Sequence, residues 1–284
     1  MQLILFLYDI IGMLLPNLGG VTSKMFLGFK YDFMKFFYIM DASHVKVRTG
    51  IPGLDSVISG GFREGRALVL SGSPGSGKTT FGMQFLYSGA KDFDEPGVFV
   101  TLSESPNDIK NDFKTYGWDI ERLVEEGKML ILDARPFKME DGFVALDESL
   151  YRGETLPYTH LTQLILSSIK RVQAKRVVID SLTVLAMQYT NMFYARQGLQ
   201  GLIHALEDQH CTSILISENA QVSKTPVEWY VASGIVLLHH VRKEDTMERS
   251  MQVIKMRGIR HSEQIFPIKI NENGLQVLHP RVSA

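Results

Sequence analysis

The sequence has few of the features that are typical of secreted, membrane-spanning or nucleic-acid-binding proteins, namely several cysteines, long apolar runs and a large excess of positive charge. Its 284 residues contain one cysteine, Cys211, so no disulfide can form within the chain. The 30 basic and 31 acidic residues nearly cancel, which removes any overall attraction to nucleic acid or anionic lipid and leaves only local patches. Because Cys211 precedes an apolar run, we expect a buried structural thiol in the reducing cytoplasm. No internal repeat or low-complexity tract occurs.

No apolar run reaches the roughly 20 residues that a membrane-spanning helix needs. The nearest candidate lies in residues 1–39, where Asp9 interrupts an apolar stretch and Pro16 follows it. A signal peptide requires a basic segment before its apolar stretch, and none is present here. Three interpretations remain open: upstream sequence translated from a misassigned start, which we favour because Met40 suits a first residue, a membrane-associating segment, or a partner-binding helix. We therefore take 1–39 as an extension and 40–284 as the functional domain.

What the chain does have is a glycine-rich run between an apolar strand pattern (67–71) and a helical pattern (79–90). The run reads Gly72-Ser73-Pro74-Gly75-Ser76-Gly77-Lys78-Thr79, and Thr80 follows it. It fits G-x-x-x-x-G-K-[ST], the phosphate-binding P-loop, in the strand–loop–helix context that the motif requires. Backbone N–H groups at a helix N-terminus attract phosphate oxygens. We expect Lys78 to reach the β- and γ-phosphates of ATP and the Thr79 hydroxyl to bind Mg²⁺.

Strand and helix patterns alternate after the P-loop, which is typical of an α/β protein with a mostly parallel sheet. Apolar runs predict strands at 97–102, 129–132, 177–179 and 212–217, the last being the fifth parallel strand. Helical spacing predicts helices from Pro106, over 161–172 and over 199–206. Residues 134–158 are polar and rich in Gly and Pro, which predicts a long surface loop. Apolar runs at 234–238, 251–256 and 265–270 suggest an antiparallel extension.

Two carboxylates follow predicted strands. Asp180 ends the run 177–179, and at the carboxyl end of a strand neighbouring the P-loop strand it can complete the metal shell that Thr79 begins. The alternative role is a helix N-cap. Glu104 lies just past Leu102, where it can orient the attacking water as a general base, or else be a solvated residue near the helix that starts at Pro106.

Lys255 and Arg257 stand two residues apart at the end of a predicted strand. Side chains at this spacing share one face of a strand, so the two cations can converge on one anion. Without other information, a surface strand with two solvated charges is the better explanation of the pair.

Several separated motifs, in order, resemble the KaiC-like ATPases of the RecA/DnaB superfamily. They are residues 49–55 (TGIPGLD), Gly60-Gly61-Phe62, Gly65-Arg66, the P-loop, Gly117-Trp118-Asp119 and Lys255-Met256-Arg257-Gly258. The resemblance covers about residues 45–270. It implies a RecA-like P-loop core that assembles into rings, usually hexamers, with ATP between neighbouring subunits.

The resemblance also implies roles for individual residues. Gly75, Gly77, Lys78, Thr79 and Thr80 match phosphate- and metal-binding positions, and Asp180 matches the second residue associated with Mg²⁺. Lys255 and Arg257 match a pair that reaches the γ-phosphate of the adjacent subunit, and His261 matches a further residue at that interface. An arginine supplied in trans makes hydrolysis depend on assembly.

Ser103 departs from the family, which usually carries two adjacent glutamates here. Glu104 then remains as the base, and slow hydrolysis is expected. A regulatory ATPase acting on an unidentified protein client is the leading function. A nucleotide-gated switch with little turnover is one alternative, and a single-stranded DNA-binding ATPase is another. For the latter, the segments 185–194 and 219–229 supply stacking candidates, although basic residues are few; the residues are Tyr189, Phe193, Tyr194, Arg196, Lys224, Glu228 and Trp229.

Overall fold

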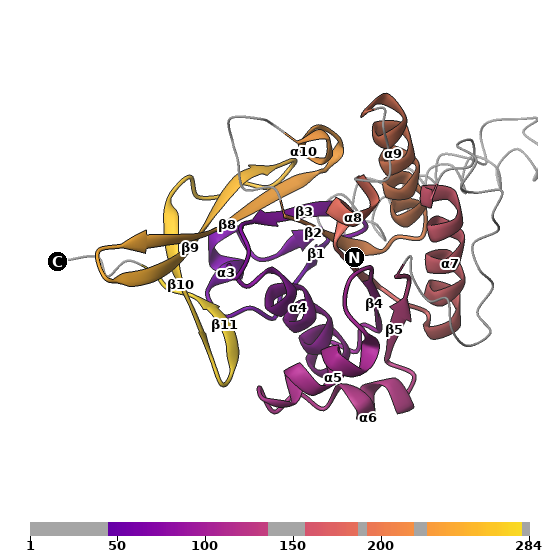
Figure 1. Cartoon of the computed structure of the whole chain (residues 1–284), viewed down its shortest axis with the longest axis horizontal. Helices are drawn as coiled ribbons and strands as arrows, with labels where there is room; N and C mark the ends of the chain where they lie inside the picture. The colour runs from indigo at the N-terminus through magenta and orange to yellow at the C-terminus, as the bar shows by residue number, and fades with distance from the viewer. Residues whose placement is uncertain (1–44, 136–156, 187–191, 219–225, 280–284) are drawn as a thin grey trace, which may run out of the picture. The chain divides into compact units, whose positions relative to one another are not determined.

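A mostly parallel nine-stranded sheet organises the computed structural model (Figure 1), which describes residues 45–135, 157–186, 192–218 and 226–279. Its parallel strands, in spatial order, are β8 (Gly234–Lys243), β3 (Ala67–Gly72), β7 (Thr212–Ser217), β6 (Arg176–Asp180), β4 (Gly97–Thr101) and β5 (Met129–Asp133). Beyond β8 lie the antiparallel strands β9 (Thr246–Met256), β10 (Ile265–Asn271) and β11 (Gly274–Val277). The predicted α/β fold with a C-terminal antiparallel extension is confirmed.

One strand differs from the prediction in its direction. The run that starts at Gly234 was expected to open the antiparallel extension, but β8 pairs in parallel with β3, from Leu68 opposite Gly234 to Gly72 opposite Leu238. The antiparallel part begins with β9. Burial agrees with this position in the sheet: the first five residues of β8 are all buried, as in a central strand covered on both faces.

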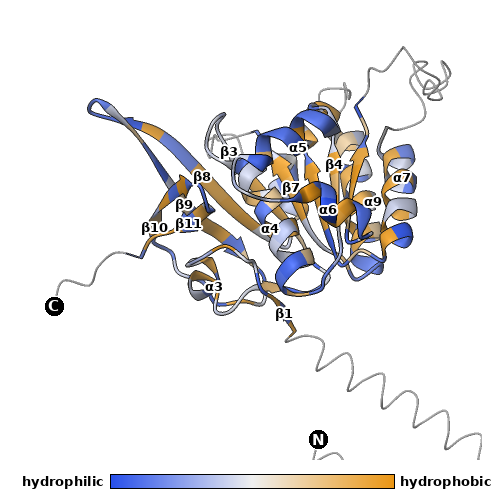
Figure 2. Cartoon of the chain, turned by 90° about the horizontal axis from the view of Figure 1, so that it is seen from below, coloured by the Kyte–Doolittle hydropathy of each residue, from blue (hydrophilic) through white to orange (hydrophobic). Residues whose placement is uncertain are grey.

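Helices cover both faces of the parallel sheet (Figure 2). Those packed on one face are α4 (Lys78–Asp92), α5 (Pro106–Lys114) and α6 (Ile120–Glu125); those on the other are α7 (Pro157–Val172) and α9 (Met192–Asp208). The helices predicted after the P-loop, from Pro106 and over 161–172 and 199–206 are therefore present. Most of the predicted loop 134–158 lies outside the described residues, as does the extension 1–39.

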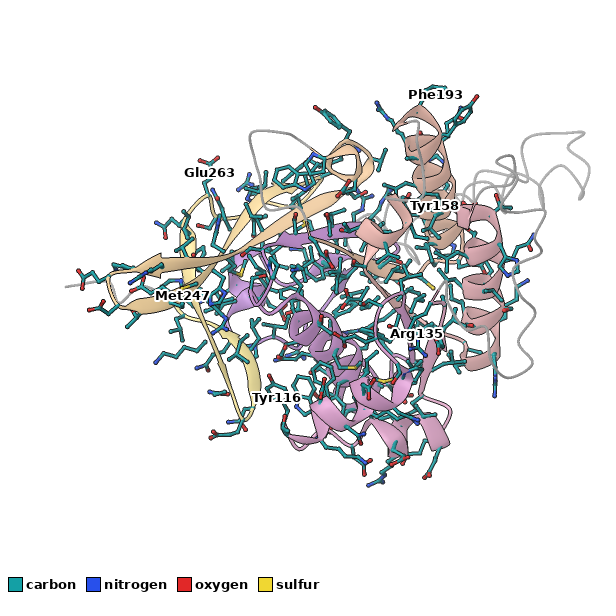
Figure 3. The ribbon with its side chains drawn as sticks, in the orientation of Figure 1. Tyr116, Arg135, Tyr158, Phe193, Met247 and Glu263 are labelled. Carbon is teal, nitrogen blue, oxygen red and sulfur yellow. The ribbon has the colours of Figure 1, made fainter. Side chains whose placement is uncertain are left out.

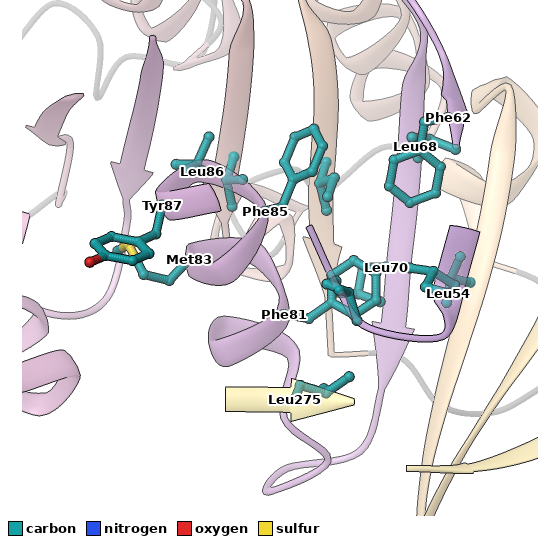
Figure 4. Close-up of a cluster of buried hydrophobic side chains, with 14 of the residues drawn as sticks. Leu54, Phe62, Leu68, Leu70, Phe81, Met83, Phe85, Leu86, Tyr87 and Leu275 are labelled. Carbon is teal, nitrogen blue, oxygen red and sulfur yellow. The ribbon is translucent and has the colours of Figure 1, made fainter. Parts of the chain in front are cut away.

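Strand β3 is anchored on both of its faces, which fixes where the P-loop begins. Leu68 and Leu70 pack with Phe81 and Phe85 of α4 (Figure 4), whereas Val69 faces the opposite core. All of these side chains are at most 3% exposed. Because full burial of one such side chain contributes about 1.5–3 kcal/mol, this strand–helix unit is a rigid base for the loop between them.

A buried arginine connects three segments of the chain through hydrogen bonds. Arg176, at the start of β6, is fully buried, and its Nε donates a hydrogen bond to the Glu95 carboxylate at 2.6 Å. The other guanidinium nitrogens donate to the backbone oxygens of Phe85 (2.7 Å) and Arg48 (2.9 Å). The charge is thus paired and hydrogen-bonded, as burial of an ion requires.

Several short elements escaped the sequence prediction. They are β1 (Lys46–Val47), α3 (Leu54–Val57), β2 (Phe62–Arg63), α8 (Leu182–Ala186) and α10 (Val227–Val231), together with α6 and β11. The expected buried thiol is confirmed: Cys211 is fully buried and its Sγ lies 3.2 Å from the Ala174 carbonyl oxygen, while burial raises its pKa to about 11. None of the helices in the described ranges is long and apolar enough to cross a membrane.

Candidate nucleotide-binding site

The P-loop connects the carboxyl end of β3 to the N-terminus of α4. The predicted phosphate-binding run, Gly72 through Thr80, spans the last residue of β3, the loop and the first turn of α4. Gly75 and Gly77 have φ of 73° and 98°, in the left-handed region that favours glycine. Gly77 caps α4, so the free N–H groups of the first helical turn face the loop. This arrangement binds anions through backbone donors and the helix dipole.

Lys78 folds back over the loop. Its Nζ donates a hydrogen bond to the Ser73 carbonyl oxygen at 3.0 Å. Burial lowers the pKa of Lys78, while the nearby carboxylates of Asp180 and Glu218 act in the opposite direction. The ammonium group therefore lies between the loop backbone and an acidic edge, where it can neutralise a bound phosphate.

Asp180 contacts the first turn of α4 directly. The Thr79 hydroxyl donates a hydrogen bond to Asp180 Oδ2 at 2.7 Å, which brings the two predicted metal-binding residues together. The expected strand adjacency is wrong, because β7 lies between β3 and β6. The contact still forms because α4 packs across β7, β6 and β4 as well as β3. Burial raises the pKa of Asp180 to about 6, against a lowering effect of the Thr79 hydrogen bond.

These oxygen ligands suit Mg²⁺. Magnesium in nucleotide sites is usually bound through one or two side-chain oxygens together with phosphates and water. The Thr79 hydroxyl and the Asp180 carboxylate are hard donors and lie within hydrogen-bond distance of each other beside the P-loop. They would hold the ion, which supplies positive charge to the β- and γ-phosphates when bound.

Glu104 lies at the same edge of the sheet. It follows β4, whose last residue, Thr101, is opposite Asp180 in the β4–β6 register. The Thr101 hydroxyl fixes the turn by donating to the Glu104 carbonyl oxygen at 2.7 Å. Burial and the carboxylates of Asp112 and Asp108 raise the pKa of Glu104, whose own charge raises that of Asp180. The carboxylate is thus close enough to interact with the metal-binding residue.

A cavity of about 460 Å³ opens beside the loop. Its walls include residues that sequence reasoning had not assigned to the site: Tyr116, Arg249 and Ile270. Tyr116, labelled in Figure 3, follows α5 and stacks on Trp118 with ring centroids 5.0 Å apart. The stack holds an aromatic face at the cavity, which suits the base of a nucleotide.

The β8–β9 ribbon braces the P-loop from outside. His240 and Arg249 are opposite each other in the ribbon. Arg249 Nε donates to the Gly75 carbonyl oxygen at 2.9 Å, and His240 Nδ1 lies 3.5 Å from that of Pro74. Because these two contacts use carbonyl oxygens of the loop, they leave its N–H groups available to phosphate.

The remaining predicted site residues lie elsewhere. Lys255 is opposite Ile235, which is opposite Val69, so it is level with the middle of β3. Arg257, just past β9, donates its N–H to Ser233, whose own N–H bonds the Ala67 carbonyl oxygen at the start of β3. His261 lies further along the same loop.

The structure thus separates these residues from the P-loop of the same chain. Ala67, with which Arg257 is level, lies five residues before Gly72, or about 17 Å along the strand at about 3.3 Å per residue. Lys255 points to the face opposite α4, where its Nζ donates to the Trp229 carbonyl oxygen at 2.8 Å. Burial and the nearby Arg257 charge lower the pKa of Lys255. The two cations are therefore neighbours, as predicted, but not part of their own chain's phosphate site.

Comparison with known proteins places this site in a family. The family model described as "ATPase: KaiC" matches residues 47–282. The circadian clock oscillator protein KaiC of Synechococcus elongatus is 35% identical over 236 residues, which are 82% of this chain and 44% of that protein. KaiC 1 of Synechocystis is 33% identical over the same length. The chain thus spans less than half of these curated relatives.

A solved structure of similar length also matches. The KaiC-like protein PH0186 from the hyperthermophilic archaeon Pyrococcus horikoshii superposes with a TM-score of 0.71 and 34% sequence identity. The match covers 83% of this chain and 99% of that one. With the P-loop, the acidic edge and the sheet order already described, these likenesses identify the chain as a member of the KaiC family of P-loop ATPases.

Proposed function

We propose that this protein is a magnesium-dependent ATPase that assembles into a ring, usually a hexamer, and shares each nucleotide between two subunits. The observation that carries the proposal is the division of the predicted site. Lys78, Thr79, Asp180 and Glu104 gather at the carboxyl edge of the sheet. Lys255 is level with the middle of β3, and Arg257 is level with its amino end. One chain therefore offers two complementary halves of a site.

Within the acceptor half, the geometry supports a division of labour. The P-loop N–H groups and Lys78 bind the β- and γ-phosphates. Thr79 and Asp180 hold the magnesium ion, and Glu104 accepts a proton from the water that attacks the γ-phosphorus. The bond from that phosphorus to the bridging oxygen breaks, releasing ADP and inorganic phosphate.

The donor half completes the charge balance from a neighbouring subunit. A guanidinium and an ammonium group supplied in trans stabilise the charge that develops on the transferred phosphoryl group. His261, on the same loop, would contact the nucleotide at that interface. Hydrolysis then depends on assembly, and the ATPase rate per subunit should rise with protein concentration.

Mixing two inactive variants tests the shared site. Lys78→Ala should abolish ATP binding and Arg257→Ala should suppress hydrolysis while each subunit retains its nucleotide affinity. In mixed rings, some interfaces combine an intact P-loop with an intact Arg257, so activity should reappear. If rings containing both variants form, as a native mass spectrum would show, and no ratio restores activity, the trans arrangement is refuted.

The rate itself decides between an enzyme and a switch. Because Ser103 cannot act as a base of comparable strength, Glu104 is left as the base that β4 provides. Glu104→Gln should spare ATP binding and suppress turnover. Undiminished hydrolysis in that variant would contradict its role, and a wild type that binds ATP without turnover would support a nucleotide-gated switch.

Single-stranded DNA binding is the second candidate, favoured by an exposed aromatic group. Phe193 and Tyr194 on α9 are 61% and 51% exposed, and Tyr230 on α10 is 57% exposed. Arg196 lies over the Tyr230 ring at 5.8 Å. Exposed rings and a guanidinium can stack on bases. Figure 3 shows Phe193 far from the pocket residue Tyr116.

Other residues of this hypothesis do not strengthen it. Trp229 and Glu228 are 5% and 9% exposed, so they are not available to bases; Tyr189 and Lys224 lie outside the described residues. Retention on single-stranded DNA that falls with salt, together with a DNA-dependent ATPase rate, would support this function. No retention at low salt would refute it. The protein client and the cytoplasmic location stay predictions.

A further inference from the structure

Glu218 occupies the centre of the acidic edge without a role in the proposed function. It directly follows β7, the strand between β3 with its P-loop and β6 with Asp180. In register, Ser217 is opposite Ser71, one residue before the P-loop run begins. Carboxyl ends of adjacent parallel strands meet at one edge of a sheet, which is where ligands bind in such folds. Glu218 therefore lies between the phosphate loop and the metal-binding aspartate.

The segment that follows Asp180 holds Glu218 in place. The Glu218 backbone N–H donates to the Thr183 hydroxyl at 3.0 Å, and its Oε1 accepts a hydrogen bond from the Ser181 hydroxyl at 3.2 Å. Oε2 accepts no hydrogen bond from any residue in the described ranges, and the residue is exposed. One carboxylate oxygen is thus tethered while the other is open to a ligand at the site.

The negative charge of Glu218 affects the pKa values of Lys78 and Asp180. It works to raise the pKa of Lys78 and adds to the rise in the pKa of Asp180. A solvated carboxylate far from the site would be screened from both groups. Because Ser103 leaves β4 with Glu104 as its carboxylate at this edge, Glu218 is the second glutamate that follows a parallel strand here and has no proposed role in holding metal.

We propose that Glu218 positions the water that attacks the γ-phosphate of ATP. Its Oε2 accepts a hydrogen bond from this water and holds the water oxygen in line with the bond to be broken, while Glu104 takes the proton. The oxygen–phosphorus bond forms as the bond to the bridging oxygen of ADP breaks. This inference rests on the proposed ATPase function and assigns a residue that the family comparison did not point to.

A conservative substitution isolates the effect on chemistry. Glu218→Gln keeps an acceptor for Ser181 and the side-chain volume, but an amide oxygen is a weaker acceptor than a carboxylate. We expect kcat to fall about 10-fold, while the Kd for ATP with Mg²⁺, measured with a fluorescent ATP analogue, changes less than about 2-fold. Glu218→Asp, which retains the charge, should recover part of the loss. Glu125→Gln, an exposed glutamate on α6, is the matched control and should behave as wild type.

The double variant Glu104→Gln/Glu218→Gln adds a second test. Residues that act on one water are not independent, so the double variant should lose less than the product of the two single losses. A kcat within about 2-fold of wild type in Glu218→Gln would overturn the inference, as would a parallel rise in Kd and loss of thermal stability, which indicates a structural role. A wild type with no more turnover than Lys78→Ala would overturn the proposed ATPase itself, and this role with it.

Discussion

Asp180→Asn should make the ligand-free protein more stable at neutral pH while it weakens the nucleotide site. Asp180 is half-buried at the end of β6, and burial raises its pKa from the ordinary 3.8 to about 6. The native state therefore keeps the proton to a higher pH than the unfolded chain. Asparagine can still accept the hydrogen bond from Thr79 and never pays the cost of a buried charge.

The size and pH window of this effect follow from the two pKa values. Between about pH 3.8 and 6 the native state binds more protons than the unfolded state, so its stability falls as the pH rises. The destabilisation caused by the ionised Asp180 carboxylate is absent below this pH window and reaches its full size above it. At about 1.36 kcal/mol per pH unit, the difference of about 2.2 units corresponds to at most about 3 kcal/mol. The variant should gain up to that amount at pH 7.5 and almost nothing near pH 4.

Urea unfolding of both proteins at several pH values, without nucleotide or Mg²⁺, measures the gain. Asp245→Asn, in the exposed turn of the β8–β9 ribbon, is a matched control that should change stability little at any pH. Equal stability of wild type and Asp180→Asn at pH 7.5, or a gain that does not shrink on acidification, would refute the reasoning. With Mg²⁺ and ATP present the order should reverse, because ligand binding stabilises only the protein that retains the site.

Two further variants probe the pocket wall and the buried ion pair. Tyr116→Ala removes the aromatic face that Trp118 supports at the cavity, so calorimetric titration should show ATP affinity about 10-fold weaker, since stacking on a base contributes about 1–3 kcal/mol; unchanged affinity would place the base elsewhere. Glu95→Gln leaves the fully buried Arg176 without its counter-charge and should lower the free energy of unfolding by about 3 kcal/mol. A loss under about 1 kcal/mol in a denaturant titration would show that the backbone acceptors alone satisfy Arg176.

Local patterns carried most of the fold. The P-loop motif, the apolar strand runs and the helical spacing each depend on residues close together in sequence, and the structure confirms those elements. The direction of β8 does not depend on its own residues. It follows from the pairing of β8 with β3, on the side of β3 opposite β7. This pairing joins residues far apart in sequence, so a local sequence pattern does not predict it.

The site was predictable where a motif or a strand end marks it. Asp180 and Glu104 were found because each follows an apolar run, and the same signal was present for Glu218 after β7. Tyr116 and Arg249 have no such mark: Tyr116 lies in the turn after α5, and Arg249 lies on a ribbon 174 residues from the P-loop carbonyl oxygen that it contacts. Only tertiary packing brings them to the cavity.

The opposite placement of the P-loop and the Lys255–Arg257 pair has an arithmetic consequence. In the proposed shared site the two halves lie on different parts of one subunit, so subunits would join head to tail, whereas two chains related by a two-fold axis would meet through the same patch on each. In a row of n subunits joined this way, the first P-loop has no donor and the last cation pair has no acceptor, leaving n − 1 complete sites. Closing the row into a ring adds the missing site without any new subunit. Opening a ring at one interface would therefore remove one of its n sites, and the ATPase activity per subunit would be lower in open assemblies than in closed ones.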